Sequence, residues 1–166
     1  LPATGLATAT YKLYVVDALG NLSAGSSNLV TIATATAPSM VTNDTPTGTA
    51  EFNSTLTNAV TFSGVPTPTL TYQWKSCTSA TDINTCSNIS GATSATYTAT
   101  AAVVGNYLRT SVTATNGVGA DSTVLSEPTV IVAAIAPGTP TIGSIVIGNL
   151  QISVPFTAPA LNGGSA

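Results

Sequence analysis

Two cysteines are the residues of this chain with the most evident chemistry. Cys77 and Cys86 flank the polar, turn-rich stretch 78–85 and closely follow Trp74. A disulfide between them would pin a hairpin, and a loop this short contributes about 2–3 kcal/mol when treated as a restriction of the unfolded chain. Two free thiols in a reducing compartment are the alternative, and a metal site lacks a histidine because the sequence contains none. We expect the disulfide, and with it an oxidising location.

Acid, base and nucleophilic chemistry find little support. Without histidine the usual general base is missing, and a Ser or Cys nucleophile would depend on the few charged residues present. The carboxylates are scattered, with no pair at the spacing of a glycosidase and no acidic cluster suited to calcium. They are Asp17, Asp44, Glu51, Asp82, Asp121 and Glu127. We therefore expect no enzyme activity, no cofactor and no metal.

The amino-acid composition favours strands as the elements that position these residues. Only 5% of the residues are charged, whereas soluble domains usually have about 25%. Helical surfaces thus have little to be built from, while the abundant Thr and Val suit a pleated surface. No stretch keeps a helical period for a full helix. The fold class predicted is all-β.

Two classes of partner are excluded by charge and hydropathy. Three basic residues against six acidic ones leave no positive surface for nucleic acid. The longest apolar run, Val130 to Ala136, ends at Pro137, and a membrane-spanning helix needs about 20 apolar residues. We expect neither nucleic-acid binding nor a membrane span in this segment.

A repeated Ala-Pro pair divides the chain. Strand-like runs precede both Pro38 and Pro137, which lie 137 − 38 = 99 positions apart. That spacing is the size of one immunoglobulin-type sandwich of about 100 residues. Residues 37–136 are therefore predicted to form one complete domain, bordered by short Ala-Pro linkers that restrict the angle to its neighbours.

The two flanks are predicted to be incomplete neighbours of this domain. In residues 1–36, a strand over 11–17, a turn over 18–21 and a strand over 29–33 form the last two strands of one domain. In residues 137–166, strands over 141–147 and 150–156 form the first hairpin of another. About 30 residues cannot bury enough surface to fold alone, so each flank must be completed, in the same chain or by another copy.

The central strands show a clear pleat. Leu70, Tyr72 and Trp74 alternate with polar residues, so one face of this strand is apolar and Trp74 is the expected core anchor. Facing apolar residues are expected from the other strands: Val60, Phe62, Tyr97, Leu108, Val112 and Ala114.

The central residues resemble the bacterial Ig-like repeat of long secreted and surface proteins. The resemblance covers about residues 38–133 and rests on Tyr72-Gln73-Trp74, the Cys pair, Ile89 to Thr93, Tyr97, Val104-Gly105 and Val112 to Asn116. The stretches 137–140, 154–159 and 162–165 are similar to the opening of a fibronectin type III repeat. The resemblance implies tandem immunoglobulin-like and fibronectin type III-like β-sandwiches, which occur in adhesins, wall proteins, filaments and spacers of polysaccharide hydrolases.

Three further motifs can each be interpreted as functional or as ordinary surface structure. Leu1 to Gly5 spells a sortase sorting signal, but a β domain follows it, so we interpret it as a loop. Lys12 and Lys75 are predicted to point outward rather than to form Lys–Asn crosslinks. The sequons at Asn21, Asn43, Asn53 and Asn88 permit glycans but arise easily in so Asn- and Thr-rich a chain.

The function expected is structural or adhesive and extracellular, at the cell surface or in a secreted protein. Partners would be neighbouring repeats of the same chain or other copies of it, as in a rod, filament or sheath. One alternative is an accessory module that binds a surface glycan or protein through Tyr97, Tyr107 and the loop between the cysteines. The other is a spacer attached to a secreted polysaccharide hydrolase.

Overall fold

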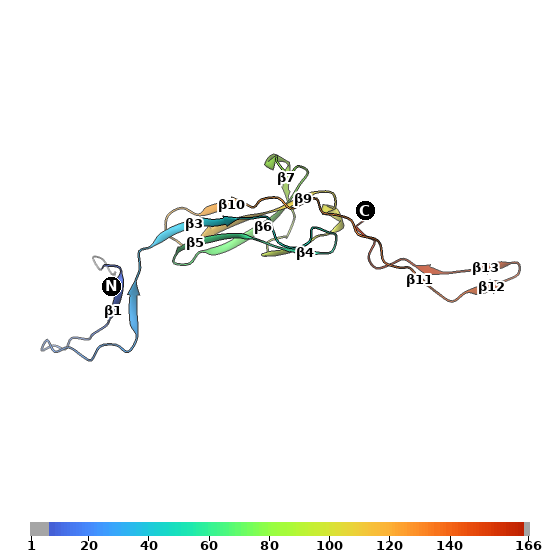
Figure 1. Cartoon of the computed structure of the whole chain (residues 1–166). Coiled ribbons are helices and arrows are strands. Elements are labelled where there is room, and N and C mark those ends of the chain that lie inside the picture. The colour runs from blue at the N-terminus through green and yellow to red at the C-terminus, as the bar shows by residue number, and fades with distance from the viewer. Residues whose placement is uncertain (1–6, 165–166) are drawn as a thin grey trace.

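The computed structural model describes residues 7–164 and shows an all-β protein (Figure 1). The only helices in this described part are two short 3₁₀ turns, η1 (Ile83–Thr85) and η2 (Ala101–Val103). We call residues 36–135 the central body, residues 7–35 the N-terminal extension and residues 136–164 the C-terminal extension. Figure 1 shows the two extensions reaching away from opposite ends of the central body.

A four-stranded antiparallel sheet forms the middle of the central body, in the order β10-β9-β6-β7. Its strands are β6 (Thr69–Cys77), β7 (Cys86–Asn88), β9 (Tyr107–Thr115) and β10 (Ser122–Leu125). β6 and β9 pair over their whole lengths, from Thr69 opposite Thr115 to Cys77 opposite Tyr107. Because side chains alternate along a strand, this register decides which residues share each face of the sheet.

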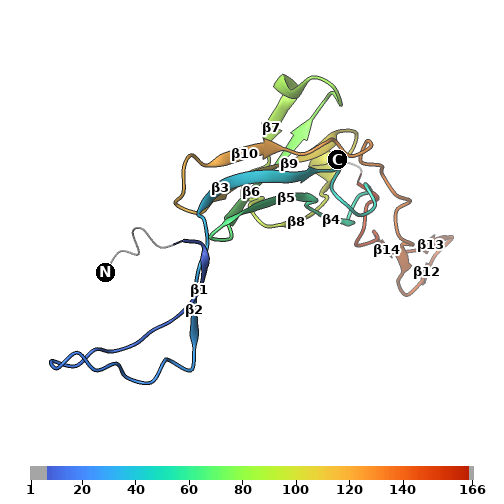
Figure 2. The same cartoon turned by 60° about the vertical axis from the view of Figure 1, so that its left-hand side comes forward.

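Two shorter strand pairs complete the central body. β3 (Thr36–Asn43) pairs with β5 (Val60–Val65), and β4 (Thr55–Thr57) pairs with β8 (Thr96–Thr98), both antiparallel. Figures 1 and 2 show these pairs lying along one side of the four-stranded sheet. Leu56 of β4 belongs to the same buried cluster as Trp74 of β6 and Leu108 of β9, so the β4–β8 pair covers the apolar face of the sheet.

Trp74 anchors this core, as its alternation predicts. The side chain is fully buried, and its indole Nε1 donates a hydrogen bond of 2.9 Å to the backbone oxygen of Ser94. The Tyr97 ring lies beside it, with the ring centroids 5.7 Å apart. The buried indole therefore has both apolar contacts and a partner for its one polar group. Val60, Val112 and Ala114 are buried too, as expected from the sequence.

The N-terminal extension has shorter strands than the sequence predicts. β1 (Ala9–Lys12) pairs with β2 (Leu29–Ile32), so the strand expected over 11–17 ends at Lys12. Beyond it, the backbone follows an irregular path held by single bonds, such as those from the Ser23 N–H to the Val15 oxygen and from the Ser26 N–H to the Leu13 oxygen. The predicted turn is present, with the Gly20 N–H donating to the Asp17 oxygen.

The C-terminal extension is a long, narrow hairpin. Near its base β11 (Thr141–Ile142) pairs with β14 (Phe156–Thr157), and near its tip β12 (Val146–Gly148) pairs with β13 (Gln151–Ser153). The sequence predicts this hairpin but not its ending. After β14 the chain returns to the central body, where the Ile135 N–H donates to the Gly163 oxygen at 2.9 Å.

The first Ala-Pro pair is not a linker, contrary to the prediction. Ala37 and Pro38 lie inside β3, and Pro38 is buried. Proline lacks the backbone N–H that a regular ladder needs as a donor. Here the register shifts between Thr36 and Ser39, so Pro38 is not required to donate a ladder hydrogen bond. The run that precedes Pro137 is not a continuous strand, because β10 ends at Leu125, although Thr129 and Val132 donate backbone hydrogen bonds to Leu108 and Asn106.

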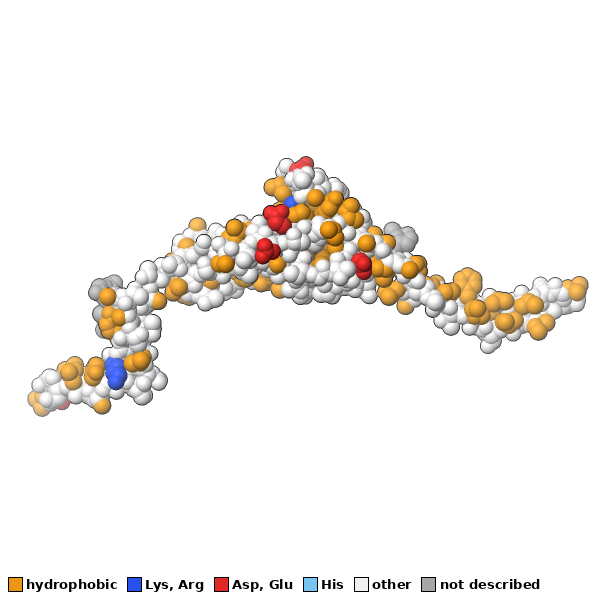
Figure 3. Space-filling model, viewed as in Figure 1, with side chains coloured by type: hydrophobic (Ala, Val, Ile, Leu, Met, Phe, Trp, Pro, Cys, Tyr) orange, Lys and Arg blue, Asp and Glu red, His pale blue; other side chains and the backbone are white. Residues whose placement is uncertain are grey.

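Large apolar side chains are exposed mainly on the two extensions. Leu19 and Leu22 are 88% and 67% exposed at one end, and Ile147 and Leu150 are 80% and 101% exposed at the other. Figure 3 shows apolar side chains along both arms. A search of the described residues for a helix long and apolar enough to span a bilayer finds none.

We predict that replacing Trp74 with Ala lowers the free energy of unfolding by about 3–5 kcal/mol, because the change removes a fully buried ring and leaves a cavity. Urea titration followed by circular dichroism measures the loss. Ile83→Ala is the control, since this side chain is 58% exposed, and should leave stability nearly unchanged. Equal effects of the two substitutions would contradict the assignment of Trp74 as the core anchor.

Candidate functional site

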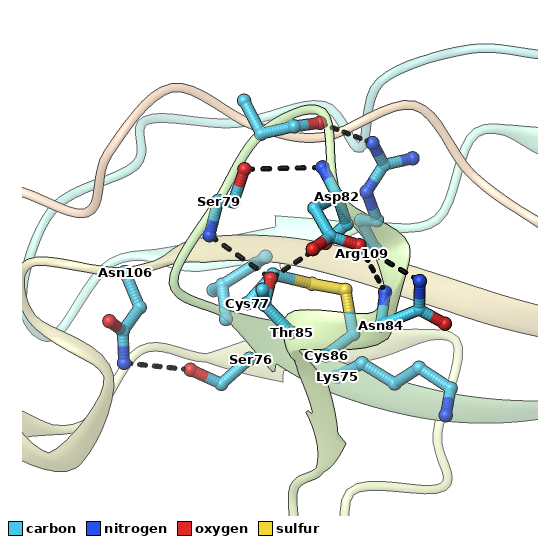
Figure 4. The surroundings of a disulfide bond; sticks show 12 residues. Lys75, Ser76, Cys77, Ser79, Asp82, Asn84, Thr85, Cys86, Asn106 and Arg109 are labelled. Carbon is cyan, nitrogen blue, oxygen red and sulfur yellow. Dashed lines mark hydrogen bonds between the residues drawn. A yellow bond between two sulfur atoms is a disulfide. The ribbon is translucent and has the colours of Figure 1, made fainter.

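A disulfide joins Cys77 at the end of β6 to Cys86 at the start of β7 (Figure 4). The two residues are directly opposite each other in the ladder between these strands. Cys77 is fully buried and Cys86 half-buried. The structure thus contains the bond that the spacing of the two cysteines predicts.

The loop between the cysteines is closed by its own short polar side chains. The Asp82 carboxylate accepts a hydrogen bond from the Asn84 N–H at 3.0 Å and caps η1. The Ser79 hydroxyl accepts from the Asp82 N–H at 3.1 Å, and the Thr85 hydroxyl donates to the backbone oxygen of Asp82 at 2.7 Å. Such bonds from Ser, Thr and Asp to nearby backbone are typical of tight turns.

Arg109 lies beneath this loop and was not singled out by the sequence. Its side chain is only 6% exposed. One terminal nitrogen donates to the backbone oxygen of Ser126 and the other to that of Ala80, each at 2.6 Å, while Nε has no partner. The guanidinium therefore ties the disulfide loop to the segment that follows β10 through two charge-assisted hydrogen bonds.

No local sequence pattern reveals the role of Arg109. In the register of β6 and β9 it pairs with Lys75, on the face of the sheet opposite Trp74. From alternation alone this face is expected to be solvated. Arg109 is covered because residues 78–85 fold over the sheet and the segment at Ser126 lies beside it, and both contacts are distant in sequence.

A shallow cavity lies beside Tyr97. Its volume is about 230 Å³, and hydroxyl side chains and the Tyr97 ring line much of it. The lining residues are Ser90, Gly91, Ala92, Thr93, Ser94, Thr96, Tyr97 and Thr98. Tyr97 is half-buried, and its hydroxyl lies 3.3 Å from that of Thr100.

Tyr107, the second tyrosine proposed for a binding surface, does not join this cavity. It stands opposite Cys77 in the β6–β9 register, and therefore on the face that carries Arg109. Tyr97 packs instead against Trp74, which faces the core. The structure thus separates the sequence-predicted binding residues into the cavity with Tyr97 and the disulfide loop with Tyr107.

Asp17 stabilises the turn that follows it. Asp17 accepts bonds of 2.9 Å from the Leu19 N–H, the Asn21 N–H and the Asn21 side-chain amide. The hydrogen bond from the Asn21 side chain, followed by that from its backbone, lowers the pKa of this fully exposed carboxyl. No group of three or more His, Cys, Asp or Glu residues suited to a metal occurs within residues 7–164.

The two lysines considered for crosslinking differ in their surroundings. Lys12 is exposed, as expected. Lys75 is half-buried, and its Nζ donates a hydrogen bond of 2.7 Å to the side-chain oxygen of Asn88, which is exposed. This is a polar contact between neighbouring strands at the surface.

The remaining motifs add surface chemistry only. The sequon residues Asn21, Asn53 and Asn88 are exposed and Asn43 is half-buried. The sorting-signal letters of Leu1 to Gly5 lie outside the described residues.

Comparison with known proteins supplies no family. No known protein family matches the chain, and no curated protein matches it either. Function is therefore inferred from the disulfide, the cavity and the two extensions.

We predict that the double substitution Cys77→Ala and Cys86→Ala lowers the free energy of unfolding by about 2–3 kcal/mol, because the unfolded chain is released from a short closed loop. Guanidinium titration of both forms under non-reducing conditions measures the difference. Ser87→Ala, at the exposed position that follows Cys86 on β7, should change the stability little. An unchanged midpoint for the double variant would contradict a stabilising disulfide.

Proposed function

We propose that this chain is part of an extracellular structural or adhesive protein built from tandem immunoglobulin-like and fibronectin type III-like β-sandwiches. The central body supports a complete sandwich at about residues 37–136. Its four-stranded sheet and the β4–β8 pair enclose one buried cluster around Trp74, Leu56 and Leu108. Two sheets packed over a common apolar core are the architecture of that class.

The two extensions support the tandem arrangement. Each is a strand pair without a core of its own, and two-stranded hairpins are at best marginally stable in water. Their exposed leucines, valines and isoleucines are the residues that a complete sandwich would bury. We assign residues 1–36 to the closing strands of a preceding repeat and residues 137–166 to the opening strands of a following one.

The observation that carries the proposal is that the central body has a buried core, whereas the extension at each of its ends has exposed apolar side chains. The proposed role is mechanical, because repeats joined end to end can space or assemble other components outside the cell. The disulfide supports an oxidising location. A spacer between catalytic domains of a polysaccharide hydrolase would use the same features, and the flanking sequence distinguishes it from an adhesin or filament.

We predict that protease treatment of intact source cells releases peptides of this chain, joined to peptides beyond Leu1 and Ala166. The native mass should greatly exceed 16.4 kDa, and the peptide carrying Cys77 and Cys86 should be disulfide-linked. Mass spectrometry, with and without reduction, tests each point. Recovery only from the lysed cell interior, with free thiols, would contradict the location. A native mass near 16.4 kDa would instead favour completion of the extensions between copies.

The cavity beside Tyr97 favours a second candidate function, recognition of a glycan. Sugars bind through stacking of their apolar face on an aromatic ring and through hydrogen bonds to their hydroxyls. The cavity offers a half-buried tyrosine ring surrounded by serine and threonine hydroxyls. Its open, shallow form suits one or two units of a longer chain.

We predict that a glycan array probed with the intact chain identifies saturable binding that Tyr97→Ala weakens at least about tenfold, which corresponds to ~1.4 kcal/mol for the lost ring contact. Tyr107→Ala is the matched control, because this tyrosine lies on the other face of the sheet, and it should bind normally. Absence of any array binding, or equal losses in both variants, would contradict a glycan site at Tyr97.

A further inference from the structure

Two consecutive glycines bring the C-terminal extension back to the central body. Gly163 and Gly164 are both buried, and their φ angles are +77° and +85°. The Gly163 oxygen accepts from the Ile135 N–H at 2.9 Å, and the Leu161 oxygen accepts from the Gly138 N–H at 3.1 Å. The chain leaving the central body and the chain returning to it therefore run side by side.

Space as well as backbone conformation restricts these two positions to glycine. A Cβ atom at Gly164 would lie 2.9 Å from Cγ2 of Val104 and 3.0 Å from Cβ of Phe52. At Gly163 it would collide with the Ile135 oxygen. Left-handed φ angles are also unfavourable for residues with a side chain. The loop is thus seated directly against the end of the central body.

The surface that the Gly-Gly loop contacts is held by backbone hydrogen bonds and by the core. The Phe52 N–H donates to the Ala133 oxygen at 2.8 Å, which holds the turn after Ala50 against the last segment of the central body. Val104 follows η2 directly, and Val103 beside it is buried in the core. A docked segment therefore meets a surface anchored to the core rather than a loose loop.

We infer that this end of the central body, formed by Phe52, Val104 and Ile135, is a docking surface for the Gly-Gly loop of the following repeat. The inference deepens the proposed function and rests on it for the identity of that repeat. The C-terminal extension is fixed at both its ends, by residues 135–138 and by residues 161–164. A unit attached through one linker can swing about it, whereas a change of direction here must break both attachments.

The joint can be tested with residual dipolar couplings in the intact 166-residue chain. In the parent chain, one alignment tensor should fit the amides of the central body and those of β11 and β14 together. In Gly163→Ala and Gly164→Ala, the couplings of the extension should fall to about half or less, while those of the central body remain. Gly91→Ala is the matched control, because Gly91 also has a positive φ, +72°, but its Cβ would meet nothing within 4 Å.

Two results would contradict the proposal that the extension is fixed to the central body. One is an extension that already requires a separate, strongly reduced tensor in the parent chain, and the other is an extension unchanged by both glycine substitutions. Fluorescence of Trp74, the single tryptophan, monitors unfolding of the central body and should give the parent midpoint in Gly163→Ala and Gly164→Ala. The location and length of the native protein are measured separately, so a flexible joint would leave the extracellular tandem-repeat proposal standing.

Discussion

The register between β6 and β9 is the constraint on which the rest of the central body depends. With Cys77 opposite Tyr107, Trp74 falls opposite Thr110 and faces the core. The same register places Arg109 and Cys77 on the other face, where the disulfide loop covers them. A shift of this pairing by one residue would place Trp74 opposite Arg109 or Ser111, and the indole and the guanidinium would then share one face of the sheet. One ladder thus organises both the core and the covered outer surface.

Pairs of threonine hydroxyls link several neighbouring strands of this charge-poor chain. Hydroxyls of Thr42 and Thr61 lie 2.8 Å apart, and those of Thr113 and Thr123 also 2.8 Å, in each case between neighbouring strands. Thr55 and Thr98 make a similar contact at 3.0 Å. Such cross-strand pairs stabilise modestly, but they are neutral and are not screened by salt. These contacts between strands therefore do not depend on the salt concentration of the medium.

Features with a short sequence period could be predicted, whereas features made by distant segments could not. Alternation around Trp74 and the spacing of Cys77 and Cys86 are local signals, and the structure contains both the buried indole and the bond. The prediction of a linker at Pro38 is wrong, because the register shift against β5 makes a proline acceptable inside β3 and the sequence does not show that shift. Burial of Arg109 and the return of Gly163 to Ile135 depend on loops meeting segments far along the chain, and composition carries no trace of either.

The disulfide has a consequence for the extensibility of the chain. Residues 77 to 86 would span about 30 Å if drawn out straight, but the bond keeps their Cα atoms 4.0 Å apart. A molecule pulled from its two ends therefore lengthens less when it unravels, because tension passes from Cys77 to Cys86 without entering the loop. Reduction of the disulfide adds the length of this loop to the extended chain, so the redox state of the surroundings sets the maximum end-to-end length of the unfolded unit.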